Sequence, residues 1–174
     1  MLDLSALVHQ CTPANVSPTT MHQIMAVESA GRSHTIGFKL IRRVRTIEQG
    51  GPAVRKEVSW LKTQPRNKSE AIQWARYLQG QGYDFDAGIA QIHSTNFARY
   101  GLTIESVFDP CRNIEVSARI LTECYARALQ RFRQRAPALG AALSCYQSGD
   151  FETGFGTGYV QKVVAAPVSF QRKP

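Results

Sequence analysis

The 174-residue sequence lacks any apolar stretch long enough to cross a membrane. A spanning helix needs about 20 consecutive apolar residues, and the best stretch, residues 137–146, stops far short. Acidic residues are also few, with 13 Asp and Glu against 21 Lys and Arg and a formal net charge of +8. Such a surface favours polyanions, namely nucleic acid, anionic lipid head groups or an acidic cell-wall polymer. The 43% hydrophobic content excludes a disordered chain and fits one globular domain.

Close pairs of cysteine or histidine, which are typical of zinc sites, are missing as well. The four cysteines show no CxxC or CxxH spacing and the four histidines are scattered, so no metal is expected. Cys124 and Cys145 would lie level across an antiparallel helix pair, and Cys11 and Cys111 each lie on an apolar stripe at a helix end. We therefore expect the disulfides Cys11–Cys111 and Cys124–Cys145, and with them an oxidising compartment. Four buried free thiols are the alternative.

Apolar periodicity and capping residues predict a mostly helical α+β chain with one small β region. Helices are expected over residues 2–11, 18–31, 67–78, 111–133, 137–149 and 159–164, with short helical turns over 94–101 and 103–109. Segment 34–66 is predicted to contain a twisted β-hairpin with its turn at 49–52. The helix that begins at Pro137 is apolar on every side, which is typical of a central helix.

One carboxylate lies on the apolar stripe of the helix over residues 18–31. The stripe includes Met21 and Met25 and reaches Glu28 at its next position. Burial and the negative end of the helix dipole both disfavour an ionised carboxylate there, so the pKa of Glu28 should rise. A raised pKa is what a general acid needs. The alternative is a frayed last turn in which Glu28 reaches solvent or pairs with Arg32.

Four short motifs, in this order, resemble those of the lysozyme-like lytic transglycosylases. Residues 27–31 (Val-Glu-Ser-Ala-Gly) resemble the catalytic Glu-Ser motif, and residues 88–92 (Gly-Ile-Ala-Gln-Ile) resemble Gly-Leu-Met-Gln-Ile. Residues 144–149 (Ser-Cys-Tyr-Gln-Ser-Gly) are similar to the family's Ala-Tyr-Asn-x-Gly motif. Residues 158–163 (Gly-Tyr-Val-Gln-Lys-Val) are similar to its closing Tyr-Val segment. The order of the four motifs makes the resemblance specific.

Two further segments bring the likeness closest to the specialised transglycosylases of type IV secretion and conjugative transfer. These are Cys-Thr-Pro at residues 11–13 and Phe-Asp-Pro-Cys at residues 108–111. The resemblance covers roughly residues 11–165. It implies a fold like that of goose-type lysozyme and the soluble lytic transglycosylases. We expect a single catalytic domain over residues 1–165 and a basic C-terminal tail over residues 166–174.

The resemblance implies that Glu28 is the catalytic residue of a peptidoglycan-cleaving enzyme without a cofactor. As an acid it would protonate the glycosidic oxygen between N-acetylmuramic acid and N-acetylglucosamine. As a base it would accept the proton of the muramoyl C6 hydroxyl, which gives a 1,6-anhydro product. Tyr146 is expected to hydrogen-bond or orient Glu28, and Tyr159 to close the wall behind it. The substrate-binding residues so implied are Ser29, Gln91, His93, Tyr146, Gln147 and Tyr159.

Three positions depart from the family's pattern, because Ala90 replaces Met, His93 replaces Asn and Gln147 replaces Asn. Gln147 keeps an amide but moves it by one methylene. The family resemblance and the expected disulfides place the protein in the periplasm or cell envelope. Residues 1–31 contain no Lys or Arg, so the positive start of a signal peptide is absent. We therefore expect either a leader that has been trimmed or export by another route.

Three other functions compete with the transglycosylase. A lysozyme-type hydrolase would need a second carboxylate, for which Asp84 and Asp86 are the candidates. A degenerate fold could serve as an assembly partner of a secretion machine, although the retention of Glu28 argues against it. A nucleic-acid-binding module is disfavoured, because no helix-turn-helix or aromatic pattern accompanies the basic cluster. That cluster consists of Lys39, Arg42, Arg43 and Arg45.

Overall fold

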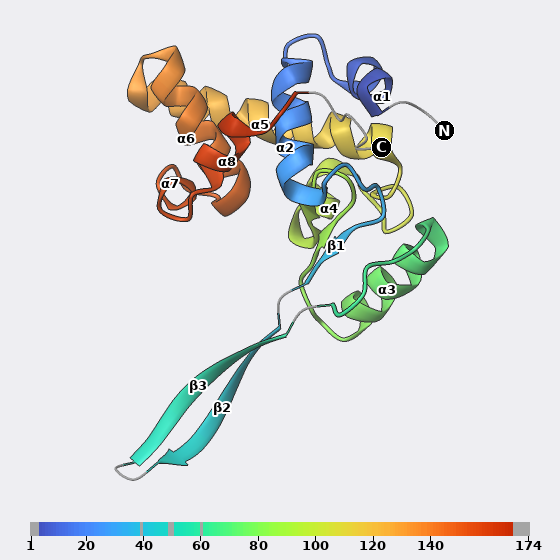
Figure 1. The fold of residues 1–174 in the computed structure, drawn as a ribbon, viewed down its shortest axis with the longest axis vertical. Coiled ribbons are helices and arrows are strands. Elements are labelled where there is room, and N and C mark those ends of the chain that lie inside the picture. Colours follow the sequence, from blue (N-terminus) through green and yellow to red (C-terminus); the bar gives the residue numbers. More distant parts are fainter. Residues whose placement is uncertain (1–3, 39, 49–50, 60, 169–174) are drawn as a thin grey trace.

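A computed structural model describes residues 4–38, 40–48, 51–59 and 61–168 (Figure 1). The helices are α1 (Leu4–Cys11), α2 (Pro18–Ser29), α3 (Lys68–Gly80), α4 (Phe97–Tyr100), α5 (Pro110–Phe132), α6 (Arg135–Ser148), α7 (Thr153–Gly156) and α8 (Tyr159–Ala165), with a 3-10 turn η1 (Ser94–Asn96). The strands are β1 (Ile36–Gly37), β2 (Leu40–Glu48), β3 (Gly51–Ser59), β4 (Asp86–Ala87) and β5 (Ile92–His93). The fold is therefore α+β and mostly helical, as the sequence predicts.

The strands form two antiparallel sheets. β4 lies between β1 and β5, with Ile36 opposite Ala87 and Asp86 opposite His93. β2 and β3 pair as the predicted hairpin, in a register that places Leu40 opposite Ser59. The side chains of the hairpin lie outside the described residues. That holds for the whole basic cluster of Lys39, Arg42, Arg43 and Arg45.

Helix α2 carries Glu28 in its last turn. Pro18 is its first residue, where the missing N–H costs no hydrogen bond. Ser17 occupies the N-cap position, but its side chain makes no capping hydrogen bond. The helix ends because Ala30 adopts a left-handed conformation (φ 53°) and its N–H bonds to the Met25 carbonyl. The last turn is closed, and Glu28 is held on an intact helix.

Helices α5 and α6 form the antiparallel pair that the cysteine spacing required. α5 begins at Pro110 under a side-chain cap from Asp109, which accepts from the Arg112 N–H at 2.9 Å. The short turn expected over residues 103–109 is present at residues 104–108. One expectation was wrong, because α6 is not buried on every side: Leu139 is 40% exposed.

Both expected disulfides are present. Cys11–Cys111 joins α1 to α5 with a Cα–Cα distance of 5.0 Å, and Cys124–Cys145 joins α5 to α6 with a distance of 5.8 Å. The alternative of four free thiols is therefore wrong.

The described part of the chain has no helix that combines the length and hydropathy of a membrane span.

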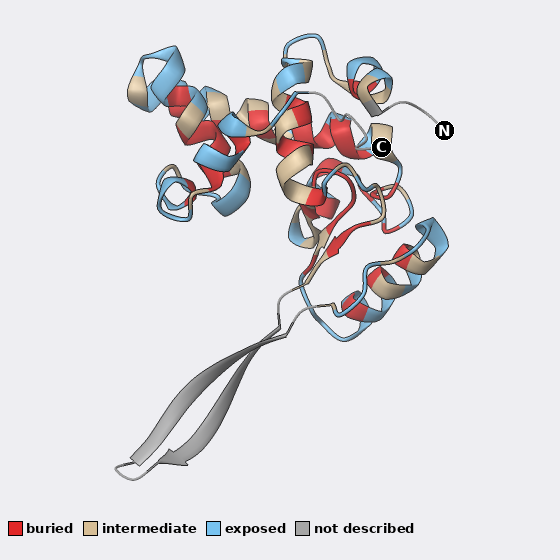
Figure 2. Ribbon diagram, in the orientation of Figure 1, coloured by how far each residue is buried: buried red, intermediate tan, exposed pale blue. Residues whose placement is uncertain are grey.

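The buried residues, coloured red in Figure 2, form two large cores in the described part of the chain and a small third cluster of Ala128, Ala138 and Ala141 between α5 and α6. The larger lies among α1, α2, α5, α6 and α8 and includes Met21, Met25 and Ile114. The second lies among the three-stranded sheet, α3, α4 and the start of α5, and includes Phe85 and Phe108. Figure 1 shows β1 and α3 as a group apart from α6, α7 and α8. The cleft described next lies against β4, β5 and α4 from the part of the chain near β1, and against the end of α6 from the other group.

Candidate active site

A cleft of about 1040 Å³ runs past the end of α2. Its lining comes from the end of α2, from β4, β5 and the turn between them, from η1 and α4, and from α5 and the end of α6. The lining residues that bear on function are Glu28, Asp86, Gln91, His93, Arg99, Glu123, Arg127, Tyr146 and Gln147. Among the residues singled out by the sequence, Glu28, Gln91, His93, Tyr146 and Gln147 thus meet in one place. Ser29 and Tyr159 lie behind this surface and are buried.

Glu28 has an environment suited to a general acid. Burial raises the pKa of its carboxyl group to about 7, against a lowering effect from a hydrogen bond that the Tyr159 hydroxyl donates. The negative charge of Asp86 raises the pKa further. Tyr159 Oη lies 2.5 Å from Glu28 Oε1. The alternative of a frayed turn is not what the structure shows, since Glu28 is bonded to Tyr159 rather than to Arg32.

Ser29 ties the end of α2 to the motif at residues 88–92. Its hydroxyl donates to the Ile89 carbonyl at 2.7 Å, and the side chain is buried. Ser29 therefore holds the segment that faces Glu28, and it does not line the cleft.

The motif at residues 88–92 forms a tight turn between β4 and β5. Gly88 has φ +84°, and a Cβ there would lie 2.2 Å from Asn113 Nδ2, so only glycine fits. Gln91 also has positive φ (50°), and its side chain closes the turn by donating to the carbonyls of Gly88 (2.8 Å) and Thr35 (3.0 Å). The turn thereby presents Gln91 to the cleft in one orientation.

Asn113 is a positioning residue that the sequence analysis missed. It is fully buried on α5, where its Oδ1 accepts from the Ala90 N–H at 2.9 Å. Its Nδ2 donates to the carbonyls of Ala87 (3.0 Å) and Val107 (2.8 Å). A signal was present, because Asn113 and Ser117 are two polar residues at i, i+4 spacing on the apolar stripe of α5.

Tyr146 and Tyr159 make hydrogen bonds to different parts of the site. The Tyr146 hydroxyl donates to the Ala90 carbonyl at 2.6 Å and shares a hydrogen bond of 2.7 Å with Ser117. The hydrogen bond to Glu28, expected from Tyr146, comes instead from Tyr159 at the start of α8. The reason is tertiary: α8 packs against α2, whereas the end of α6 faces α5 and residue 90. Burial raises the pKa of both tyrosines, so both remain neutral donors.

Asp86 and His93 form a pair on the sheet side of the cleft. His93 Nδ1 lies 2.8 Å from Asp86 Oδ1, and this contact raises the pKa of the imidazole.

Asp84 is exposed and lies outside the cleft lining. Gln147 is exposed at the rim and accepts from the Thr157 hydroxyl at 3.3 Å. Within the described residues, no group of three or more His, Cys, Asp or Glu is placed to hold a metal ion.

Comparison with known proteins agrees with this arrangement. The chain belongs to the transglycosylase SLT domain family, whose sequence model matches residues 10–163. It is similar to the type IV secretion system protein virB1 of Brucella suis biovar 1 (strain 1330) and of Brucella melitensis biotype 1 (strain ATCC 23456 / CCUG 17765 / NCTC 10094 / 16M). The identity to each is 39% over 172 residues, which covers 95% of this chain and 64% of the relative.

A more distant relative is protein virB1 of Agrobacterium fabrum (strain C58 / ATCC 33970), which is 29% identical over 169 residues. That match covers 94% of this chain and 59% of the relative. The chain therefore spans less than two thirds of the length of these relatives. No solved structure shows a significant match to it.

Proposed function

We propose that the protein is a lytic transglycosylase that cleaves the β-1,4 bond between N-acetylmuramic acid and N-acetylglucosamine of peptidoglycan. The observation that carries the proposal is Glu28, a carboxyl group with a pKa of about 7 that lines a long cleft and has a tyrosine hydroxyl as its partner. A group that titrates near neutrality can donate a proton and take one back in the same cycle.

The proposed reaction uses the one carboxyl group twice. Protonated Glu28 gives its proton to the glycosidic oxygen as the bond from muramoyl C1 to that oxygen breaks. The muramoyl C6 oxygen then bonds to C1, and its hydroxyl proton passes to the Glu28 carboxylate. The products are a 1,6-anhydromuramoyl end and a free N-acetylglucosamine hydroxyl, and no water is consumed.

The neighbouring residues have supporting parts in this proposal. Gln91, His93 and Gln147 contact the sugars from the cleft walls. Tyr159 positions the Glu28 carboxyl group, and Tyr146 holds the Ala90 carbonyl on the opposite side. Ser29 has no sugar contact in this scheme, because it is buried under Ile89.

Hydrolysis is the second candidate function, since Asp86 lines the same cleft as Glu28. A retaining or inverting glycosidase uses a second carboxylate as nucleophile or as base for water. The Asp86 carboxylate is engaged by His93 at 2.8 Å, which favours a supporting role for Asp86 over attack on the sugar.

Mass spectrometry of the fragments released from purified peptidoglycan distinguishes the two reactions. The wild type should release anhydro-muropeptides, and Glu28→Gln should release none. Asp86→Asn serves as the matched variant and should still give anhydro products. Reducing-end fragments from the wild type, lost in Asp86→Asn, would establish hydrolysis. The absence of any product from the wild type would leave a binding or assembly role.

We further propose that the enzyme opens the cell wall locally for a secretion or conjugation apparatus, from the periplasm or cell envelope. The names of the Brucella relatives support the association with a type IV secretion system. The two disulfides support an oxidising compartment. Transfer by a secretion system that depends on this protein should fail in cells that produce Glu28→Gln at the wild-type level.

A further inference from the structure

The charged groups that line the cleft are nearly all paired with one another. In the described lining there are three carboxylates and three basic side chains, namely Glu28, Asp86, Glu123, His93, Arg99 and Arg127. Asp86 pairs with His93 at 2.8 Å and Glu123 pairs with Arg99 at 2.7 Å. Glu28 has Tyr159 as its partner. Arg127 is left as a cation without a carboxylate.

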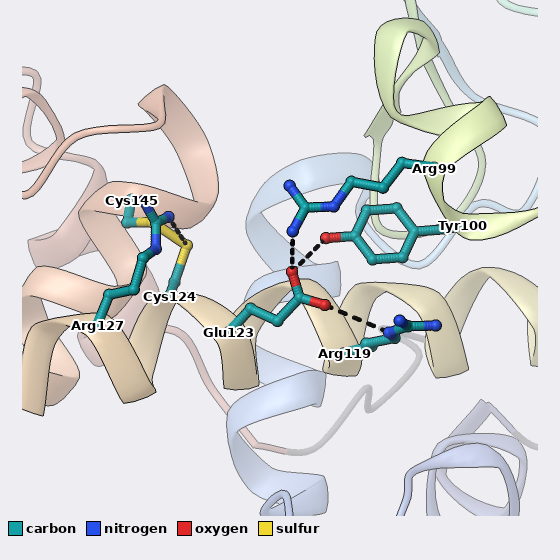
Figure 3. Close-up of polar contacts among 7 residues, drawn as sticks. All are labelled: Arg99, Tyr100, Arg119, Glu123, Cys124, Arg127 and Cys145. Atoms are coloured by element: carbon teal, nitrogen blue, oxygen red, sulfur yellow. Dashed lines mark hydrogen bonds and ion pairs between the residues drawn. A yellow bond between two sulfur atoms is a disulfide. The ribbon is translucent and has the colours of Figure 1, made fainter.

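Both carboxylate oxygens of Glu123 accept hydrogen bonds (Figure 3). Its Oε2 accepts from Arg99 Nη2 at 2.7 Å and from the Tyr100 hydroxyl at 2.8 Å, and its Oε1 accepts from Arg119 Nε at 3.3 Å. Two guanidinium groups therefore share this carboxylate, and it is not free to compensate Arg127 one turn further along α5.

Arg127 is held in place by uncharged neighbours. Its Nη2 donates to Cys145 Sγ at 2.8 Å and lies 3.5 Å from Cys124 Sγ, so the guanidinium rests on the disulfide (Figure 3). Its Cζ also lies 5.9 Å from the ring centre of Phe151. Sulfur and ring contacts orient the group while most of its five N–H donors stay available, and none of the described carboxylates is within ion-pair distance of it. An oriented guanidinium with free donors matches a carboxylate.

We propose that Arg127 binds a carboxylate of the stem peptide carried by the muramoyl residue. This inference rests on the proposed function and specifies its substrate as peptide-bearing strands. In intact peptidoglycan the lactyl carboxyl group of each muramoyl sugar is amide-linked to the peptide, so the free carboxylates of the strand belong to the peptide. The location is suitable, because Cys145, on which Arg127 rests, directly precedes Tyr146 beside the turn at residues 88–92.

The test uses one set of soluble glycan fragments in two forms. In one form the peptide carboxylates are free, and in the other they have been converted to amides with carbodiimide and ammonia. Dissociation constants are measured by calorimetry in a Glu28→Gln background, so that binding does not depend on turnover. Amidation should weaken binding about tenfold, as expected for the loss of a charge-assisted pair. With Arg127→Gln added, amidation should change binding less than about twofold.

Arg131→Gln is the matched control. Arg131 also lies 5.9 Å from the Phe151 ring centre, but it pairs with Glu152 and lies outside the cleft lining. It should show the same amidation effect as the parent. Arg127→Lys, which keeps the charge, should retain part of the effect, and thermal melting confirms that each variant is folded.

Equal binding of the two forms by the Glu28→Gln parent, or an equal amidation effect with and without Arg127→Gln, would overturn the inference. The same holds if neither form binds. The proposed function fails by a different result, which is the absence of anhydro products from the wild type. The binding measurement and the product measurement therefore give separate answers.

Discussion

Opposing effects set the pKa of the Glu28 carboxyl group. Burial and the negative charge of Asp86 raise the pKa of its carboxyl group, while the hydrogen bond from Tyr159 lowers it, and the balance lies at about 7. Without the tyrosine hydroxyl, the Glu28 carboxyl group would hold its proton more tightly and would donate it to the glycosidic oxygen less readily. Tyr159 therefore tunes the acid as well as positioning it.

Tyr159→Phe should raise the pKa of Glu28, because it removes a hydrogen bond that stabilises the ionised form. The rate should fall on the alkaline side as the acid loses its proton, with a midpoint near pH 7 in the wild type, and this midpoint should move upward in the variant. The pH profile of kcat/KM for muropeptide release measures it. Tyr125→Phe is the control, because Tyr125 lies on α5 and is not among the residues that line the cleft. A midpoint that stays or moves downward would contradict the assignment.

Glu28→Gln should stabilise the folded protein at high pH. The folded pKa of about 7 lies above the ordinary value of 4.5, so ionisation destabilises the folded state. The stability linked to protonated Glu28 is fully present below pH 4.5 and is lost as the pH rises through 7. The variant's advantage should therefore grow across this window to at most about 3 kcal/mol. Urea unfolding at pH 4 and pH 8 measures it, and an advantage that does not depend on pH would contradict the raised pKa.

The turn between β4 and β5 is the element that the rest of the site depends on. Ser29 reaches it from α2, Asn113 from α5 and Tyr146 from the end of α6. Three helices thus converge on one short backbone segment, and they orient Gln91 through it. A shift in this turn should therefore disturb the parts of the cleft lining that come from β5 and from the end of α6.

Gly88→Ala should destabilise the protein by roughly 3 kcal/mol or more and abolish activity, since the new methyl group would overlap Asn113 and the Val107 carbonyl. Gly82→Ala is the matched control. Gly82 has a similar φ (+73°) but open space around it, so it should lose only about 1 kcal/mol. Denaturant unfolding of both variants separates backbone strain from overlap, and equal losses would contradict the close approach at Gly88.

Local signals predicted the elements better than the contacts between them. Pro18, Asn67 and the apolar stripe of α5 mark helices that depend on a few neighbouring residues, and those helices were predicted. The short turn over residues 103–109 was also predicted, and it is held locally, because the Thr103 and Ser106 side chains and backbone groups hydrogen-bond to one another.

The residues of the candidate site also differ in whether local sequence could predict their roles. Glu28 stood out because a carboxylate on an apolar stripe is anomalous wherever the helix packs. The choice between Tyr146 and Tyr159 as its partner depends on which helix packs against α2, and no local pattern carries that information. The charged group of Arg99, Glu123 and Arg127 was missed because it forms only where α4 packs against α5.

At the scale of the whole molecule, the two disulfides close loops of very different length. Cys11–Cys111 spans 100 residues and Cys124–Cys145 spans 21. Both end on α5, so this helix is cross-linked to α1 near its start and to α6 along its second half. The prediction that the domain ends at residue 165, before a basic tail, remains a prediction; α8 ends at Ala165, and residues 169–174 lie outside the described chain.

Replacing Cys11 and Cys111 by alanine should cost more stability than replacing Cys124 and Cys145. Removing the disulfide that closes the longer loop gives the unfolded chain more conformational entropy. The free energy of unfolding should therefore fall by about 5 kcal/mol without Cys11–Cys111 and by about 3 kcal/mol without Cys124–Cys145. Guanidinium unfolding without reductant measures both, and intact-mass analysis before and after reduction confirms the bonds in the parent. The opposite order would show that loop length does not dominate.

The hydrogen bond between Tyr159 and Glu28 joins residues that are 131 positions apart in the chain. A ribosome that adds roughly 5–20 residues per second needs on the order of ten seconds to travel that distance. Throughout this interval the nascent polypeptide already contains the acid but not the hydroxyl that tunes it. Any product of premature termination before residue 159 would therefore carry Glu28 in an unfinished pocket.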